Sequence, residues 1–384
     1  MPIMQSNSPR VMIVVGESSG DLHGANLLIE LKKIYPNIYC YGLGGKYMRK
    51  AGATILTDAS ELSVVGLVEI IRHYRRLRGI LNRMISELKD NPPELLVLID
   101  SPDFNLRLAK AAKQYNVKVL YYISPQIWAW RSSRIKIIKK YVDMMAVVFP
   151  FEVIFYKNAG VPVHYVGHPL IKDAVATVDK KTVFQNEKLG ISKKLIGIFP
   201  GSRKSEIERN FPILIDAAEK LSQQRIDVQF ITPIASTLSK NFIKSYTDSS
   251  KLDITITTEN IYNVINACDA IAAASGTVTL QITLMQIPYL IVYKISPITY
   301  YLLKRIVNFT YAGIANVIAN KEICKEFIQN SANPDLIALE IDKLISDESY
   351  VDTMKIEMRE IKKRLGSKDG SAETAQLVAD LITT

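Results

Sequence analysis

The chain has 384 residues and a mass of 43.1 kDa, which predicts two domains, because a typical domain holds roughly 150 residues. Its residues are 48% hydrophobic and 22% charged, a balance that excludes wholesale disorder. No apolar run approaches the ~18 residues of a membrane span, and residues 1–10 do not resemble a secretion signal. Three scattered cysteines favour neither a disulfide framework nor a zinc site, so we expect a cytoplasmic protein.

The positive charge is concentrated in the first half of the chain. Residues 1–170 hold 22 Lys and Arg against 13 Asp and Glu, whereas residues 171–384 hold 26 against 25. Nearly all of the net charge of +10 therefore belongs to the first half. This asymmetry predicts an anionic partner on one side of the protein, either nucleic acid or an anionic membrane.

Short apolar runs alternate with helical patterns along both halves. Strands are predicted at residues 11–15, 38–41, 95–99, 117–123, 195–199, 228–231 and 270–274, with a turn at 42–45 and a polar linker at 171–194. This alternation is typical of parallel, doubly wound α/β sheets. We expect two Rossmann-like domains facing a cleft, residues 1–170 and 171–355. A helical tail, residues 356–384, is expected to end in a helix that crosses back to the first domain.

Ligands of such sheets bind at the carboxyl ends of the strands. The loop after residues 11–15 carries three candidate substrate-binding residues, Glu17, Ser19 and Asp21. Its sequence is neither the dinucleotide fingerprint nor a P-loop, so nicotinamide binding and P-loop hydrolysis are not favoured. A tight turn in which Asp21 acts as a helix cap is an equally good interpretation.

Two carboxylates and an amide follow the predicted strand at 95–99. Asp100 stands where it can accept a proton from an incoming hydroxyl, and we predict it to be catalytic. Asp103 is better placed to cap the next helix. We include Asp103 and Asn105 among the candidate substrate-binding residues.

Two loops of the second half have the composition of anion-binding loops. Gly201, Ser202 and Arg203 follow the strand at 195–199, with Glu206 one helical turn later. The segment Ser275-Gly276-Thr277 follows the strand at 270–274 and repeats the design. Two such loops predict a diphosphate ligand. The sequence contains no Asp-x-Asp, so a metal-bridged diphosphate is not indicated and no metal site is expected.

A basic amphipathic helix is predicted at residues 67–83. Arginines at positions 72, 75, 76, 78 and 83 are interleaved with apolar residues. Such a helix is typical of an anionic membrane surface. A core-packed helix with a solvated arginine face explains the pattern equally well.

Several motifs, in the order in which they occur, resemble those of the lipid-A-disaccharide synthases. They are Gly16-Glu17-Ser18-Ser19-Gly20-Asp21, Gly42-Leu43-Gly44-Gly45, residues 99–105, residues 124–131 with Trp128 and Trp130, Pro150-Phe151-Glu152, Val166-Gly167-His168-Pro169, residues 200–203 and residues 275–277. The aromatic stretch is the most specific of them. The resemblance covers residues 11 to about 330.

The resemblance implies a GT-B fold and an inverting glycosyltransferase without metal or cofactor. Its partners would be a UDP-sugar donor, UDP-2,3-diacylglucosamine, and an acylated sugar phosphate acceptor, 2,3-diacylglucosamine 1-phosphate. The product would be a β-1,6-linked disaccharide. The family works as peripheral proteins on the inner face of the inner membrane, with no nucleic acid as partner, and a homodimer is compatible with it.

The resemblance also implies roles for individual residues. Asp100 would be the general base, and Arg203 would stabilise the leaving diphosphate. Residues 275–277 would line the UDP pocket. Asn316 would lie near the donor, although Ala315 precedes it where the family usually has Pro. Gln281 stands where the family usually has the Glu that holds the donor ribose, which puts donor affinity in question.

Acyl chains require an apolar surface, and we expect the segment 298–306, the helix at 67–81, or both to enter the bilayer. The nearest alternative is another GT-B UDP-sugar transferase or an epimerase, which would not need the basic amphipathic helix. A nucleic-acid-binding protein is a distant alternative suggested by the charge alone.

Overall fold

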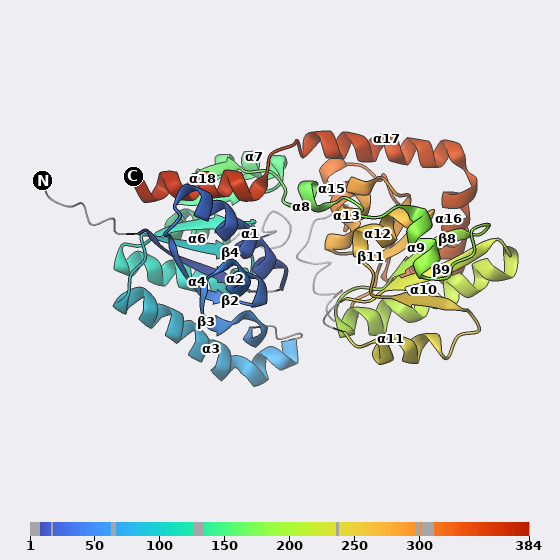
Figure 1. Cartoon of the computed structure of the whole chain (residues 1–384), viewed down its shortest axis with the longest axis horizontal. Coiled ribbons are helices and arrows are strands. Elements are labelled where there is room, and N and C mark those ends of the chain that lie inside the picture. Colours follow the sequence, from blue (N-terminus) through green and yellow to red (C-terminus); the bar gives the residue numbers. More distant parts are fainter. Residues whose placement is uncertain are drawn as a thin grey trace, which may run out of the picture. The chain divides into compact units, whose positions relative to one another are not determined.

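The computed structural model describes residues 8–16, 18–62, 67–125, 134–235, 238–296, 300 and 311–383, without the side chains of residues 18 and 67–74. The chain forms two compact units. The first comprises Met1–Pro169 and Leu365–Thr384, and the second comprises Leu170–Arg364. Figure 1 shows that each unit is an α/β structure with helices around a sheet.

The first unit contains a seven-stranded parallel sheet in the order β3-β2-β1-β4-β5-β6-β7. Its strands are β1 (Arg10–Val15), β2 (Tyr39–Gly44), β3 (Thr54–Asp58), β4 (Leu95–Ile99), β5 (Lys118–Tyr122), β6 (Met144–Val147) and β7 (Val163–Tyr165). All five residues of β4 are buried, as expected for a central strand that helices cover on both faces.

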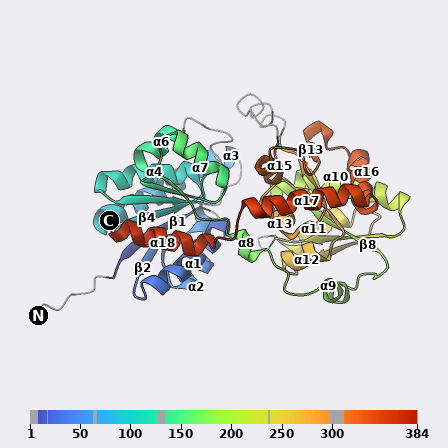
Figure 2. The ribbon, with the colours of Figure 1, turned by 90° about the horizontal axis from the view of Figure 1, so that it is seen from above.

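Helices cover both faces of this sheet. They are α1 (Ser18–Ile34), α2 (Lys46–Ala51), α3 (Leu67–Asp90), α4 (Pro102–Ala112), α6 (Arg134–Tyr141), α7 (Pro150–Asn158) and α18 (Gly370–Thr383), with short 3-10 helices η1 (Ala59–Glu61) and η2 (Lys113–Tyr115). Figure 2 shows α1, α2 and α18 on one side of the sheet and α4, α6 and α7 on the other. Helix α18 packs against α1, β4 and β5, so the end of the chain completes the first unit.

The second unit contains a six-stranded sheet in the order β10-β9-β8-β11-β12-β13, again with only parallel pairs. Its strands are β8 (Lys194–Phe199), β9 (Val228–Pro233), β10 (Ile254–Thr257), β11 (Ala270–Ala274), β12 (Tyr289–Tyr293) and β13 (Glu326–Ile328). Its helices are α8 (Leu170–Asp173), α9 (Lys180–Asn186), α10 (Lys204–Gln224), α11 (Lys240–Thr247), α12 (Ile261–Ala267), α13 (Thr277–Met285), α15 (Ile314–Ala319), η3 (Gln329–Ser331), α16 (Pro334–Ser346) and α17 (Glu348–Arg364).

The predicted α/β class with two doubly wound parallel sheets is confirmed, but local details differ. The glycines expected to form a turn at 42–44 belong to β2, where the pairing with β3 shifts between Gly42 and Leu43. Gly42 has a φ of +141°, and a Cβ there would meet the carbonyl oxygen of Ile13 at 2.2 Å. The expected linker at 171–194 includes helix α9, and the expected border after residue 355 falls inside α17.

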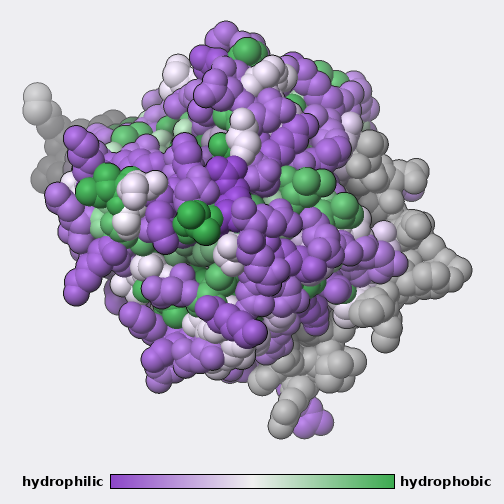
Figure 3. All heavy atoms as spheres, turned by 90° about the vertical axis from the view of Figure 1, so that its right-hand side faces the viewer, coloured by the Kyte–Doolittle hydropathy of each residue, from purple (hydrophilic) through white to green (hydrophobic). Residues whose placement is uncertain are grey.

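The surface of the second unit that Figure 3 presents is mostly hydrophilic, and its hydrophobic side chains form separate small groups. Among the described residues, no helix combines the length and the apolar character that crossing a bilayer would require.

Candidate active site

Each sheet has a topological switch point. This is the place between two neighbouring strands from which the chain adds its later strands toward opposite edges of the sheet. It lies between β1 and β4 in the first unit and between β8 and β11 in the second. Ligands of open α/β sheets bind at the carboxyl ends of the strands at this point. The loops that carry Asp100, Arg203 and Ser275 all begin at these strand ends.

In the first unit, the loops after β1 and β4 meet at a glycine. A Cβ on Gly16 would lie 2.1 Å from the Cβ of Ser101, so only glycine allows this approach. Asp100 and Ser101 both adopt left-handed backbone conformations, with φ of 52° and 44°. Such conformations are unfavourable for residues with a side chain and often occur at functional sites.

The backbone of Asp100 is held by two side chains. Its carbonyl oxygen accepts hydrogen bonds from the Tyr121 hydroxyl, at 2.5 Å, and from Asn105 Nδ2, at 2.7 Å. Asn105 is fully buried and also donates to the carbonyl oxygen of Ile99, at 3.1 Å. Burial raises the pKa of Tyr121 well above its usual value, which keeps its hydroxyl a donor. Asn105 therefore supports the loop that carries Asp100.

Asp103 lies in the first turn of α4, but the N-cap residue is Ser101 and no side-chain hydrogen bond caps this helix, so the capping interpretation is wrong. Its side chain is 76% exposed and forms an ion pair with Arg134, the first residue of α6, whose side chain is only 13% exposed. The pair connects the first turn of α4 to the first turn of α6.

Asp21, in the first turn of α1, organises the start of α2, which follows strand β2. This carboxylate is 3% exposed and accepts hydrogen bonds from the backbone amides of Gly45, Tyr47 and Met48, at 2.6, 2.9 and 3.1 Å. The three amides belong to the start of α2, so Asp21 caps a helix more than twenty residues away. Ser19 is exposed in the first turn of α1. Glu17, Trp128 and Trp130 lie outside the described residues.

Two histidines of the first unit are buried. Burial lowers the pKa of His23 to about 4, and burial together with the neighbouring His23 lowers the pKa of His168 to about 3. The His168 ring packs against Phe149, with ring centroids 5.1 Å apart. Both imidazoles are therefore neutral at pH 7, and their packing favours a structural role.

In the second unit, the loop after β8 closes around Glu206. One oxygen of this carboxylate accepts from the amides of Ser202 and Arg203, at 3.0 and 3.2 Å, and the other accepts from Arg203 Nη1, at 2.9 Å. Gly201 has a φ of +120°, and a Cβ there would lie 2.7 Å from Glu206. The amides and the guanidinium thus converge on one anionic group, which is the property of an anion-binding loop.

The loop after β11 leads into α13. The Ser275 hydroxyl donates to the carbonyl oxygen of Ala312 at 3.3 Å, and Gly276 and Thr277 are exposed at the helix start. Gly276 has an extended backbone with open space around it. Gln281 lies one turn after Thr277 and donates from Nε2 to the Tyr262 hydroxyl at 3.1 Å.

Asn316 is fully buried in α15. Its Oδ1 accepts from the amides of Ile323 and Cys324, and its Nδ2 donates to the Cys324 carbonyl oxygen. Nδ2 also donates to Glu326, at 2.7 Å. Glu326, a residue that sequence reasoning missed, additionally binds the amides of Ala312 and Gly313. The sequence holds no local signal for it, because its partners lie 10 to 14 residues away.

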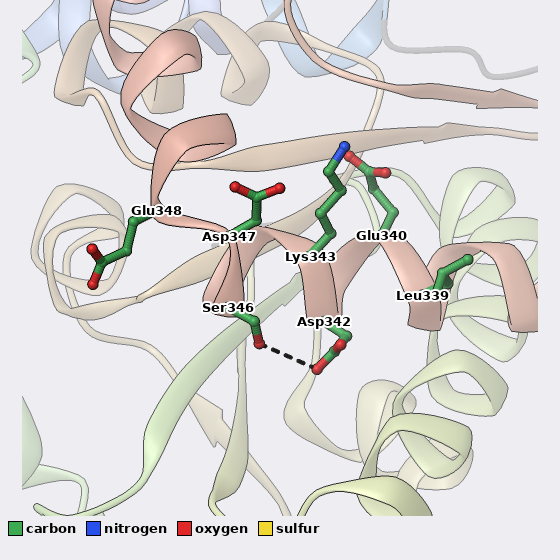
Figure 4. A pocket seen from close by; sticks show the side chains of 7 residues that line it. All are labelled: Leu339, Glu340, Asp342, Lys343, Ser346, Asp347 and Glu348. Carbon is green, nitrogen blue, oxygen red and sulfur yellow. Dashed lines mark hydrogen bonds between the residues drawn. The ribbon is translucent and has the colours of Figure 1, made fainter.

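A depression on another part of the second unit is separate from these loops. It is lined by Leu339, Glu340, Asp342, Lys343, Ser346, Asp347 and Glu348, where α16 meets α17 (Figure 4). None of the predicted site residues lines it. Within the described ranges, no group of three or more His, Cys, Asp and Glu side chains could hold a metal ion.

Two α/β units with loops of this composition at both switch points define the two-domain GT-B class of UDP-sugar transferases and epimerases. The S. aureus MnaA-UDP co-structure shares this fold with a TM-score of 0.67 at 12% identity, over 98% of both chains. A model of the Lipid-A-disaccharide synthetase family matches residues 11–380. The lipid-A-disaccharide synthase of Geobacter sulfurreducens is 44% identical to this chain over 382 residues, which cover 98% of each protein. That of Geobacter metallireducens is 43% identical to it over 377 residues, which cover 97% of each protein.

The chain belongs to the lipid-A-disaccharide synthase family. It is accordingly a glycosyltransferase with a role in the synthesis of the lipid A disaccharide. The alternative of another UDP-sugar transferase or an epimerase is not favoured.

Proposed function

We propose that the first unit binds and activates the acceptor and that Asp100 is its general base. The acceptor's 6-hydroxyl oxygen attacks the anomeric carbon of the donor, the bond from that carbon to the diphosphate breaks, and UDP leaves with the bonding electrons. Asp100 takes the hydroxyl proton. Its place at the end of β4, on a backbone fixed by Tyr121 and Asn105, supports this role.

The second unit would bind the UDP moiety of the donor. We assign Arg203 and the amides of the loop after β8 to the leaving diphosphate, whose charge grows as the bond breaks. Ser275, Gly276 and Thr277 would line the nucleotide pocket. The convergence of Arg203 and two amides on the Glu206 carboxylate supports the assignment, since it places three hydrogen-bond donors of this loop around anionic oxygen atoms.

Glu206, Asp21, Asn105 and Asn316 are assigned to the support of their loops. Each has a side chain engaged by backbone groups, so we propose that they hold the substrate-binding loops in shape. Ser19 and Asp103 are exposed and remain candidates for substrate contact.

We further propose that helix α3 brings the first unit to an anionic membrane surface on the cytoplasmic side. Arg75, Arg76, Arg78 and Arg83 are exposed, whereas Ile80, Met84 and Leu88 on the other face are buried. From Arg75 onward α3 thus has an exposed arginine face opposite a packed one, which supports electrostatic attraction rather than insertion. The segment 298–306 lies outside the described residues, apart from Tyr300.

An Asp100→Asn variant tests the catalytic assignment. With UDP-2,3-diacylglucosamine and 2,3-diacylglucosamine 1-phosphate, kcat should fall by about 10²- to 10⁴-fold, the usual contribution of a general base. Affinity for UDP should not change, because the donor loops belong to the other unit. Asp90→Asn is the matched control, because Asp90 is an exposed carboxylate at the end of α3 in the same unit, and it should keep the activity. Equal turnover in Asp100→Asn and the wild type would refute the proposal.

A further inference from the structure

Glu326 gathers three hydrogen-bond donors on one carboxylate. Oε2 accepts from the amide of Ala312 at 2.7 Å, and Oε1 accepts from the amide of Gly313 at 2.9 Å. Oε1 also accepts from Asn316 Nδ2 at 2.7 Å. An ionised carboxylate accepts through both oxygens and binds such donors more strongly than a neutral group does. Strand β13 therefore holds the segment that enters α15.

This segment is closely packed as well as hydrogen-bonded. A Cβ on Gly313 would lie 2.3 Å from Ile291 Cδ1 and 3.0 Å from Glu326 Oε1. The segment thus packs so closely against β12 and β13 that no side chain fits at position 313. Its position depends on the three contacts of Glu326.

The same segment reaches the predicted nucleotide loop. The carbonyl of Ala312, whose amide binds Glu326, accepts the Ser275 hydroxyl at 3.3 Å. Ser275 follows β11 at the switch point, next to Gly276 and Thr277. Glu326 is therefore connected to this loop through one residue, Ala312.

Glu206 supplies a comparison within the same unit. It too accepts from two successive backbone amides, those of Ser202 and Arg203, and from one side-chain donor, the Arg203 guanidinium. Two loops of the second unit are thus organised in the same way, each by a glutamate whose charge is compensated by the loop itself. A compensated carboxylate repels a nucleoside diphosphate less than a bare one would.

We propose that Glu326 is a positioning residue of the donor site. Its carboxylate fixes residues 312–313 and the Asn316 amide, and thereby places the carbonyl that accepts the Ser275 hydroxyl and holds residues 275–277 in position for a nucleoside diphosphate. This inference rests on the proposed function of the second unit.

A Glu326→Gln variant of the full-length chain tests the proposal. The side-chain amide keeps the shape but presents an N–H₂ group to at least one of the three donors. Loss of a hydrogen bond to a charged group should raise the Kd for UDP, measured by titration calorimetry, about tenfold or more. The KM for the donor should rise with it, while the KM for the acceptor stays within about twofold. Glu326→Asp keeps the charge on a shorter side chain and should give an intermediate Kd.

Glu340→Gln is the matched control. Glu340 is a buried carboxylate of the same unit and binds the Tyr350 hydroxyl at 2.7 Å. This variant should lower Tm without changing the Kd for UDP. If Glu326→Gln and Glu326→Asp both bind UDP as the wild type does, the inference is wrong. If Arg203→Ala also leaves the Kd for UDP unchanged, the proposed UDP site of the second unit is wrong, and not only the role of Glu326.

Discussion

Gly16 and Ser101 are in direct contact across the switch point of the first unit, so closely that a Cβ on Gly16 would lie 2.1 Å from that of Ser101. A Gly16→Ala variant must displace the loop that carries Asp100. Overpacking of this kind costs about 1–3 kcal/mol. We expect a lower Tm and a large loss of turnover, with UDP affinity retained, in thermal unfolding, activity and calorimetry experiments.

Gly79→Ala is the control for Gly16→Ala. Gly79 belongs to the same unit, lies in helix α3, and has nothing within 4 Å of a Cβ. Alanine there should stabilise the helix by about 0.5–1 kcal/mol and leave turnover unchanged. A Gly16→Ala enzyme as active as Gly79→Ala would contradict the role of the close contact.

Arg203→Lys should weaken UDP binding about tenfold or more, although the charge is kept. Lysine is a point charge and cannot contact Glu206 and a phosphate with separate nitrogens of one planar group. The control Arg209→Lys changes an arginine within α10, whose Nη1 donates to the carbonyl oxygen of Ser205 at 3.2 Å. Equal Kd values for UDP in the two variants would count against Arg203 as a diphosphate ligand.

Gln281→Glu restores the residue that the family usually has. If position 281 binds the donor ribose, a carboxylate offers two acceptor oxygens instead of one, and the Kd for UDP should fall. Tyr262→Phe, which removes only the partner of the Gln281 amide, should change the Kd less. An unchanged UDP affinity in Gln281→Glu would tell against a ribose contact there.

Reversing the charge of Arg75, Arg78 and Arg83 to Glu should abolish sedimentation with anionic vesicles at low salt. The attraction of a polybasic face to acidic lipid is worth about 1 kcal/mol per residue. The control Lys240, Lys244 and Lys251 to Glu makes the same change of charge in the second unit, on exposed side chains. Vesicle binding that survives in the arginine variant would disprove the electrostatic attraction.

The stability of the first unit should decline below pH 6.5. In the unfolded chain His23 and His168 have pKa values near 6.5, whereas burial lowers them to about 4 and about 3 in the folded protein. The unfolded state therefore binds more protons between about pH 6.5 and 4, and protonation favours unfolding. Tm should drop across this window, and a His168→Gln variant should flatten the drop. A Tm that is constant from pH 7 to 4.5 would contradict the burial of neutral imidazoles.

Most of the central strands were predicted from the sequence, whereas the interior strands β6 and β12 and all the outer strands were not. Strands β4 and β11 match the expected residues 95–99 and 270–274, because a strand buried on both faces is a continuous apolar run. The outer strands β3, β7, β10 and β13 are short and only partly buried, so they leave no such run.

The position of the candidate site was predictable for a related reason. Asp100, Arg203 and Ser275 directly follow buried strands, and parallel topology places these loops at one edge of each sheet. The supporting contacts were not predictable. Asp21 binds amides 24 to 27 residues away, and Glu326 binds a loop that precedes it by more than ten residues, so both depend on tertiary packing.

The fold of the first unit also constrains the order in which the protein can be completed during synthesis. Helix α18 covers α1, β4 and β5, and Lys118 Nζ donates to the carbonyl oxygen of Leu381 at 3.0 Å. A ribosome releases residues 8–169 long before this helix exists, and translates all of the second unit in between. Until then the part of the seven-stranded sheet around β4 and β5 lacks its covering helix on one face, so the unit whose synthesis begins first is completed last.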